Sequence, residues 1–234
     1  MIKVPIFILL FLIPEMNLKA PISLGLFGSS HIDHYPLYLF HRHHIHPQII
    51  SSSPKNIRDI KKQNTVQNKI AHMMANNITI DMILLIIGAN DVGTLSPQEI
   101  VQGIIDIANS FSAINIKPII VPLFNRSKPN NLTVAQYNTI RNKVNSKLRL
   151  HYKRHHQYIV IKMHDMHLKD GIHLNEKSYI YLTNAIISHI RKSTLTKYVL
   201  ESPIGHHTNT ITKEEIIAEI TTEEIKAKAK SNQN

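Results

Sequence analysis

The sequence predicts an α/β fold, a three-layer α/β/α sandwich built on a five-stranded parallel sheet. Short apolar runs alternate with longer helical patterns along most of the chain, and this alternation is typical of βαβ units with right-handed crossovers. The apolar runs are also continuous: Met82–Ile87 contains no polar residue. Continuous runs indicate strands that are covered by helices on both faces, as in parallel sheets.

Five strands follow from these runs, each ending at turn-forming or polar residues. They are expected at Ile22–Gly28, Gln48–Ser52, from Met82 to the glycine at 88, Lys117–Leu123 and Tyr158–Met163. The intervening helices are expected within His31–His46, at Thr65–Asn76, from Ser96 to about Ala113, from Thr133 to about Arg154 and at Asn175–Ile190. The third of these has the clearest start, because Ser96 and Glu99 form a capping box around Pro97 at the first helical position.

Polar side chains follow two of the predicted strands directly. Ser30 comes after the first strand and Gly28, and Asn90 comes after the third strand and Gly88. Asp170 and His173 stand three residues apart, just before the last helix of the fold. In parallel sheets ligands bind beyond the carboxyl ends of the strands. A serine, an asparagine and an Asp-x-x-His pair gathered there are the components of a serine hydrolase.

Three short blocks of this sequence resemble those of the SGNH, or GDSL-like, hydrolase family. They are Gly28-Ser29-Ser30, Gly88-Ala89-Asn90-Asp91 and Asp170-Gly171-Ile172-His173-Leu174-Asn175, in the family's order and within Pro21–Ser193. The resemblance implies a flavodoxin-like sandwich and an ester hydrolase, either a carboxylesterase or an acyl or acetyl esterase. An enzyme of this kind needs no metal and no organic cofactor.

The resemblance also implies a role for each matched residue. Ser30 would be the nucleophile, His173 the base that takes its proton, and Asp170 the carboxylate that orients His173. The oxyanion and the substrate would be bound by Ser30 through its N–H, by Asn90 through its amide, and by Gly88. The substrate would be an ester of a small molecule, a glycan or a lipid.

The sequence departs from the family pattern at two positions. Ser29 replaces the usual aspartate, and no glycine lies between Gly28 and Gly88, where the family has an oxyanion donor. The corresponding block here is Ser51–Pro54, and the third donor is left unassigned. These departures support an alternative interpretation, a catalytically weak or inactive module that acts as a basic, polyanion-binding or structural protein.

Two histidine-rich stretches offer rival chemistry. Asp165 and His167 are a second candidate acid and base, and His164 and His167 a candidate metal pair. The cluster at His41–His46 has imidazoles that suit zinc or nickel, but no carboxylate joins it at matching spacing. A solvated cluster is the expected interpretation, and no metal site is predicted.

Composition sets outer limits on function. The net charge of +11 and the pI near 9.7 favour weak binding of polyanions through a basic surface. Cysteine is absent, which excludes disulfides, thiolate zinc sites and a cysteine nucleophile.

The two ends of the chain are expected to lie outside the hydrolase-like domain, which spans residues 21–193. Residues 1–20 are apolar but too short to cross a bilayer as a helix. They are either a removed signal peptide, which would mean secretion, or a segment packed on a cytoplasmic protein, which is the expected case. Residues 194–234 form a C-terminal extension, with a charged helix from Thr212 to about Lys230.

Overall fold

The computed structural model describes residues 21–51, 56–62, 64–129, 131–152 and 157–201, with side chains described up to residue 193. The N-terminal apolar segment and the predicted helix at 212–230 lie outside the described residues. The contacts divide the chain into two units, residues 1–189 and 190–234. The description below concerns the first unit.

Within the described residues the centre of the fold is a parallel sheet of four strands. These are β1 (Ile22–Gly28), β2 (Ile45–Ser51), β3 (Met82–Ile86) and β4 (Lys117–Ile120), in the order β2-β1-β3-β4. The chain places β2 on one side of β1 and β3 on the other. The carboxyl ends of β1 and β3 therefore form the point where the strand order reverses, where open α/β sheets bind ligands.

The prediction of a fifth strand at Tyr158–Met163 is wrong. This segment makes one bridge to β4, in which Ile120 N donates to Gln157 O at 2.6 Å and Ile159 N donates to Ile120 O at 3.0 Å. The residues on either side of Ile120 that face the same edge are Pro118 and Pro122. Because proline has no backbone N–H, neither position can donate to the ladder, and within the described residues this edge holds a single bridge.

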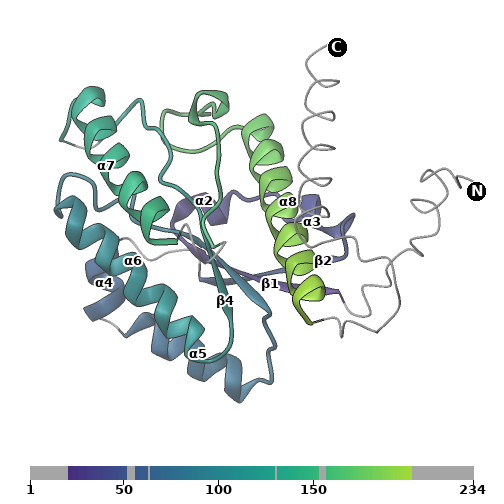
Figure 1. Ribbon diagram of the computed structural model, residues 1–234. Helices are drawn as coiled ribbons and strands as arrows, with labels where there is room; N and C mark the ends of the chain where they lie inside the picture. Colours follow the sequence, from purple (N-terminus) through teal and green to yellow (C-terminus); the bar gives the residue numbers. More distant parts are fainter. Residues whose placement is uncertain (1–20, 52–55, 63, 130, 153–156, 202–234) are drawn as a thin grey trace, which may run out of the picture. The chain divides into compact units, whose positions relative to one another are not determined.

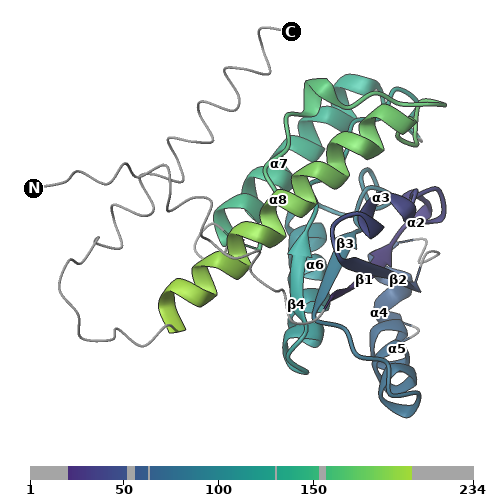
Figure 2. The same cartoon turned by 90° about the vertical axis from the view of Figure 1, so that its right-hand side faces the viewer.

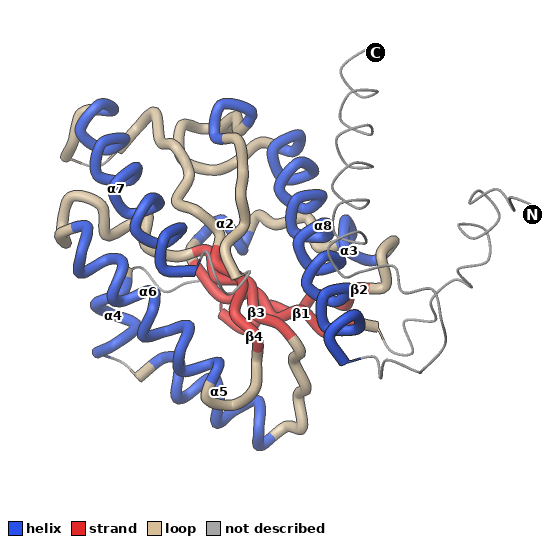
Figure 3. Tube along the Cα trace, in the orientation of Figure 1, coloured by secondary structure: helices blue, strands red, loops and turns tan. Residues whose placement is uncertain are grey.

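Helices cover both faces of the sheet. They are α2 (Ser30–Asp33), α3 (Tyr38–His41), α4 (Ile57–Lys62), α5 (Thr65–Ala75), α6 (Pro97–Ser112), α7 (Val134–Tyr152) and α8 (Glu176–Glu201), with a 3₁₀ turn at Met163–Asp165. Helices α4, α5 and α6 lie on one face, and residues 176–189 of α8 lie on the opposite face (Figures 1 and 2). The strands are thus enclosed between two helical layers (Figure 3), and the prediction of an α/β fold with a parallel sheet is confirmed.

The predicted helix boundaries hold best where the sequence carries a cap. Ser96 Oγ accepts from Glu99 N at 3.2 Å and a Glu99 carboxylate oxygen accepts from Ser96 N at 2.8 Å, so the capping box of α6 is confirmed. The single helix expected within His31–His46 is instead two short helices, α2 and α3. Pro36 lies between them, and it disfavours helical backbone at the preceding residue while lacking the N–H that a continuing helix needs.

The core is made by the apolar residues of the strands and the inner faces of the helices. Phe27 of β1 packs edge-on against Phe111 of α6, with ring centroids 5.5 Å apart. Gly103 of α6 lies so close to α4 that a Cβ there would be 2.3 Å from Ile57 Cγ2. Among the described residues no helix combines the length and the apolarity that crossing a membrane requires.

Candidate active site

Ser30 is fixed at the carboxyl end of β1, as the first residue of α2. Ser29 N donates to Ile86 O at 3.0 Å, which ties this end of β1 to the end of β3. The two strands approach so closely here that a Cβ on Gly28 would lie 2.2 Å from Ile86 O. The glycine of the first block is therefore required for close packing of the backbone, and the packing sets the position of Ser30.

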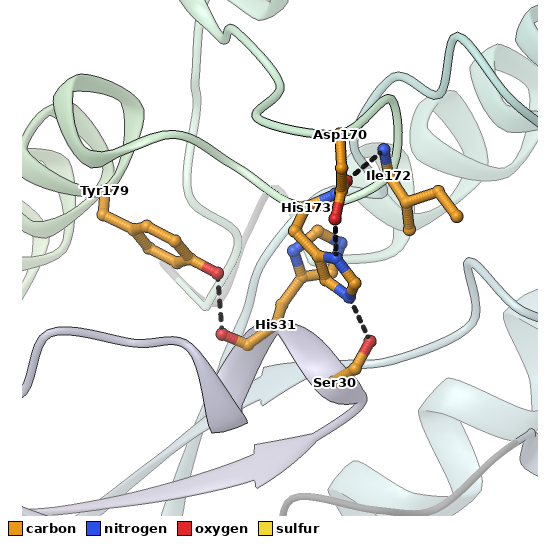
Figure 4. A network of polar contacts seen from close by, with 6 residues as sticks. All are labelled: Ser30, His31, Asp170, Ile172, His173 and Tyr179. Carbon is orange, nitrogen blue, oxygen red and sulfur yellow. Dashed lines mark hydrogen bonds and ion pairs between the residues drawn. The ribbon is translucent and has the colours of Figure 1, made fainter.

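Ser30, His173 and Asp170 form a continuous hydrogen-bonded line (Figure 4). Ser30 Oγ lies 2.9 Å from His173 Nε2, and His173 Nδ1 lies 2.7 Å from Asp170 Oδ2. Ser30 is half-buried, and the His173 side chain is 19% exposed. The structure thus brings together the three residues predicted to be catalytic, although 143 positions separate Ser30 from His173.

Asp170 is held in place by its own turn. Its Oδ1 accepts the backbone N–H groups of Ile172 and His173 at 2.9 and 2.8 Å. The hydrogen bond from the His173 side chain, together with these two, holds the pKa of Asp170 well below its usual range. The carboxylate therefore stays ionised, and it favours the His173 tautomer with hydrogen on Nδ1 and a lone pair on Nε2.

The Gly88–Asp91 turn follows β3 and presents Asn90. Gly88 has φ +96°, a conformation that residues with a Cβ rarely adopt, and a Cβ would lie 3.0 Å from Ile104 Cδ1. Asn90 is exposed, and its Oδ1 accepts from Arg126 Nη2 at 2.6 Å. Both residues lie at the same sheet edge as Ser30, and their roles in oxyanion and substrate binding stay predictions.

Asp91, the last residue of this turn, supports a neighbouring element. Its carboxylate is buried and accepts the N–H of Ile57, at the start of α4, at 3.0 and 3.1 Å. Burial raises the pKa of Asp91 to about 6, against the opposing effect of that hydrogen bond. Asp91 orders the start of α4, directly after residues 52–55, which lie outside the described residues.

His31 is a buried neighbour of this line and lies outside the three short sequence blocks. Its ring packs edge-on against Phe124 and His173, with centroids 5.1 and 5.5 Å away. Burial, followed by the neighbouring His173, lowers the pKa of His31 to about 3, so this imidazole is neutral. Tyr179 Oη donates to His31 O at 2.9 Å and fixes the backbone beside Ser30. The available signal was the position of His31, immediately after Ser30.

The rival pairs do not meet Ser30. His164 and Asp165 contact each other at 3.1 Å on the surface. His167 is anchored through its backbone, with its N donating to Ser178 Oγ at 2.7 Å and its O accepting from Asn175 N. No group of three or more metal-ligating side chains occurs in the part of the chain that the structure describes.

The sequence matches no family model and no curated protein. The structure, in contrast, is similar to many solved ones. A candidate acylhydrolase from Bacteroides fragilis has a TM-score of 0.58 at 12% identity, covering 73% of this chain and 87% of that chain. A GDSL-like lipase from Bacteroides thetaiotaomicron has a TM-score of 0.55 at 15% identity, covering 75% and 90%.

A further protein from Slackia heliotrinireducens, assigned as an SGNH hydrolase, has a TM-score of 0.53 at 9% identity, covering 71% of this chain and 98% of that chain. At such low identities the likeness concerns the fold. This chain therefore has the α/β fold of the SGNH, or GDSL-like, hydrolases, in agreement with the resemblance of its three short blocks.

Proposed function

We propose that this protein is a serine ester hydrolase with Ser30 as its nucleophile. The observation that carries the proposal is the line of contacts from Ser30 Oγ through His173 to Asp170, at 2.9 and 2.7 Å. A hydroxyl becomes a useful nucleophile when an adjacent base accepts its proton, and the base works best when a third group orients it. The fold likeness to lipolytic enzymes supports an ester as the substrate.

The first half of the reaction forms an acyl-enzyme. Ser30 Oγ attacks the carbonyl carbon of the ester while its proton passes to His173 Nε2. Asp170, which accepts from Nδ1–H, stabilises the resulting imidazolium and keeps it oriented. His173 then gives the proton to the leaving alcohol as the carbon–oxygen bond of the ester breaks.

The second half regenerates the enzyme with water. His173 removes a proton from the water, the hydroxide attacks the acyl carbon, and the acid leaves as Ser30 regains its proton. In both halves the carbonyl oxygen becomes an oxyanion. The Ser30 N–H and the Asn90 amide are the proposed donors to it, and the third donor stays unassigned.

The test compares two adjacent serines. Wild type, Ser30→Ala and Ser29→Ala are assayed on nitrophenyl esters from acetate to palmitate, and each is treated with a fluorophosphonate that labels activated serines. Ser29 is a matched control, because it is buried beside Ser30 and its side chain makes no capping hydrogen bond. Ser30→Ala should lose at least about 10³-fold in kcat and all labelling, and Ser29→Ala should retain both.

Two results would contradict the proposal. Label mapped to a serine other than Ser30 would move the nucleophile elsewhere. Wild type that neither hydrolyses any ester nor reacts with the fluorophosphonate would favour the alternative of an inactive module with a hydrolase fold.

A further inference from the structure

Arg126 is a buried cation at the candidate site without an acidic partner among the described residues. It lies between β4 and α7, is 6% exposed, and makes no ion pair in the described part of the chain. Its Nε is buried and makes no hydrogen bond, and its Cζ lies 5.8 Å from the ring centroid of Tyr137. Burying a charge is costly unless another group compensates for it, so a buried arginine without an acidic partner suggests a functional role.

The guanidinium of Arg126 donates a hydrogen bond to Asn90. Nη2 donates to Asn90 Oδ1 at 2.6 Å. A guanidinium has donors only, so the atom of the Asn90 amide that faces it has to be the carbonyl oxygen. The NH₂ group is then turned away from Arg126. An asparagine without such a partner has two nearly equivalent orientations, and one of them offers an oxygen where a donor is needed.

We propose that Arg126 is a positioning residue that fixes the Asn90 amide with its NH₂ toward the oxyanion. The inference rests on the proposed esterase function. The charge on Arg126 also withdraws electron density through Oδ1, which makes the NH₂ a stronger donor, because hydrogen bonds in a chain polarise one another. The stronger NH₂ donor then favours the transition state, in which the carbonyl oxygen becomes negative.

The segment that carries Arg126 is tied to the other half of the site as well. Ser127 N and Lys128 N donate to Gly171 O, at 2.9 and 3.3 Å, so residues 126–128 contact both Asn90 and the Asp170–His173 turn. The charge of Arg126 also contributes to the lowered pKa of the buried His31. Both observations put Arg126 beside the reacting groups.

The experiment is a double-mutant cycle between Arg126 and Asn90 on the ester that wild type hydrolyses fastest. Asn90→Ala should lower kcat about 10²–10³-fold, as expected for an oxyanion donor. Arg126→Met should lower kcat about 10–100-fold with little change in KM, since it removes a charge-assisted hydrogen bond that acts through Asn90. Adding Arg126→Met to Asn90→Ala should cost nothing more. Arg126→Lys, which keeps charge and donors and lacks an acceptor, should recover part of the loss.

Arg141 supplies the matched control. It is 7% exposed, its Nη2 donates to Asn142 Oδ1 at 2.8 Å, and its Nε is buried without a hydrogen bond, so it resembles Arg126 in burial and bonding. Arg141→Met should keep wild-type kcat. A second readout is the pair of Asn90 side-chain NH₂ signals in ¹H–¹⁵N NMR spectra. They should move in Arg126→Met toward the values of an exposed asparagine, and they should stay in place in Arg141→Met.

The outcomes separate the two proposals. If Ser30→Ala is inactive but the kcat losses of Arg126→Met and Asn90→Ala multiply in the double variant, the esterase proposal stands and Arg126 does not act through Asn90. A loss confined to KM would make Arg126 a substrate-binding residue, and unmoved Asn90 signals would refute the contact. A wild type without Ser30-dependent hydrolysis would overturn the esterase and this inference together.

Discussion

The Gly88–Asp91 and Asp170–His173 turns are built alike, but the pKa values of their carboxylates are shifted in opposite directions. Each contains a glycine at positive φ and a carboxylate that accepts from the backbone, from one N–H at Asp91 and from two at Asp170. The carboxylate of Asp91 is buried, with a raised pKa, and orders the start of α4. That of Asp170 is exposed, with a lowered pKa, and holds His173. Exposure and the choice of partner therefore separate a structural acid from one suited to chemistry.

The largest expected difference is in turnover. His173→Ala should lower kcat about 10⁴-fold or more, close to Ser30→Ala, because residues that act as one unit fail together. Asp170→Ala should retain at least about ten times more activity than His173→Ala, since its role is to orient and stabilise. Steady-state kinetics on the three variants, with folding checked by circular dichroism, measure the order. Full activity in His173→Ala with loss in His167→Ala would transfer the base to the upstream histidine.

The next effect is a difference in how stability depends on pH. The native pKa of Asp91, about 6, exceeds its ordinary value of 3.8. As the pH rises, the unfolded chain therefore releases this proton first, and the free energy of unfolding falls between about pH 4 and pH 6. Asp91→Asn removes this loss while keeping an acceptor for Ile57 N–H. Relative to wild type, its free energy of unfolding should rise by about 2 kcal/mol across that window.

Asp170→Asn should deviate from wild type in the other direction. The lowered pKa of Asp170 gives stability that is present above about pH 4 and is lost as the pH falls through the native value. The variant should therefore lose stability relative to wild type as the pH rises toward 4, and change no further above it. Urea unfolding at intervals from pH 2.5 to pH 7 tests both variants. Deviations of the same sign would remove the distinction between the two turns.

The smallest effect concerns the two glycines. An added Cβ imposes strain of about 1–2 kcal/mol at positive φ in either turn. At Gly88 the Cβ also meets Ile104 and Ile100 in the core, whereas at Gly171 it meets the side chains of Ser127 and Lys128. Gly88→Ala should therefore lower Tm more, and Gly171→Ala should lower kcat more, because its turn carries His173. Thermal unfolding and esterase assays that gave the reverse order would contradict this.

The sequence was most informative where one residue type is required by local geometry. The glycine before Ser30, the capping box of α6 and the Asp-x-x-His spacing each leave few alternatives, and they located the end of β1, the start of α6 and the turn that carries Asp170 and His173. The prediction of a fifth strand was wrong, although the sequence contains the reason. Pro118 and Pro122, which cannot donate to a neighbouring strand, both lie within the strand predicted at Lys117–Leu123.

Side-chain contacts between distant segments could not be predicted from the sequence. Arg126 meets Asn90 across 36 positions, and nothing in its local pattern separates it from other basic residues. His31 was predicted only as part of a helix within His31–His46, and nothing in its local pattern indicated that its ring packs against Phe124 and His173. Polyanion binding stays a prediction, since the net charge of +11 counts the whole chain, including ends that lie outside the described residues.

The prolines on the outer edge of β4 also bear on self-association. An open sheet edge offers a row of N–H and C=O groups to which another molecule can add a strand, and this is a common route to aggregation. Here Pro118 and Pro122 supply no donor, and the N–H and C=O of Ile120 are already used by Gln157 and Ile159. The same feature that limits the sheet to four strands thus protects this edge against intermolecular β-pairing.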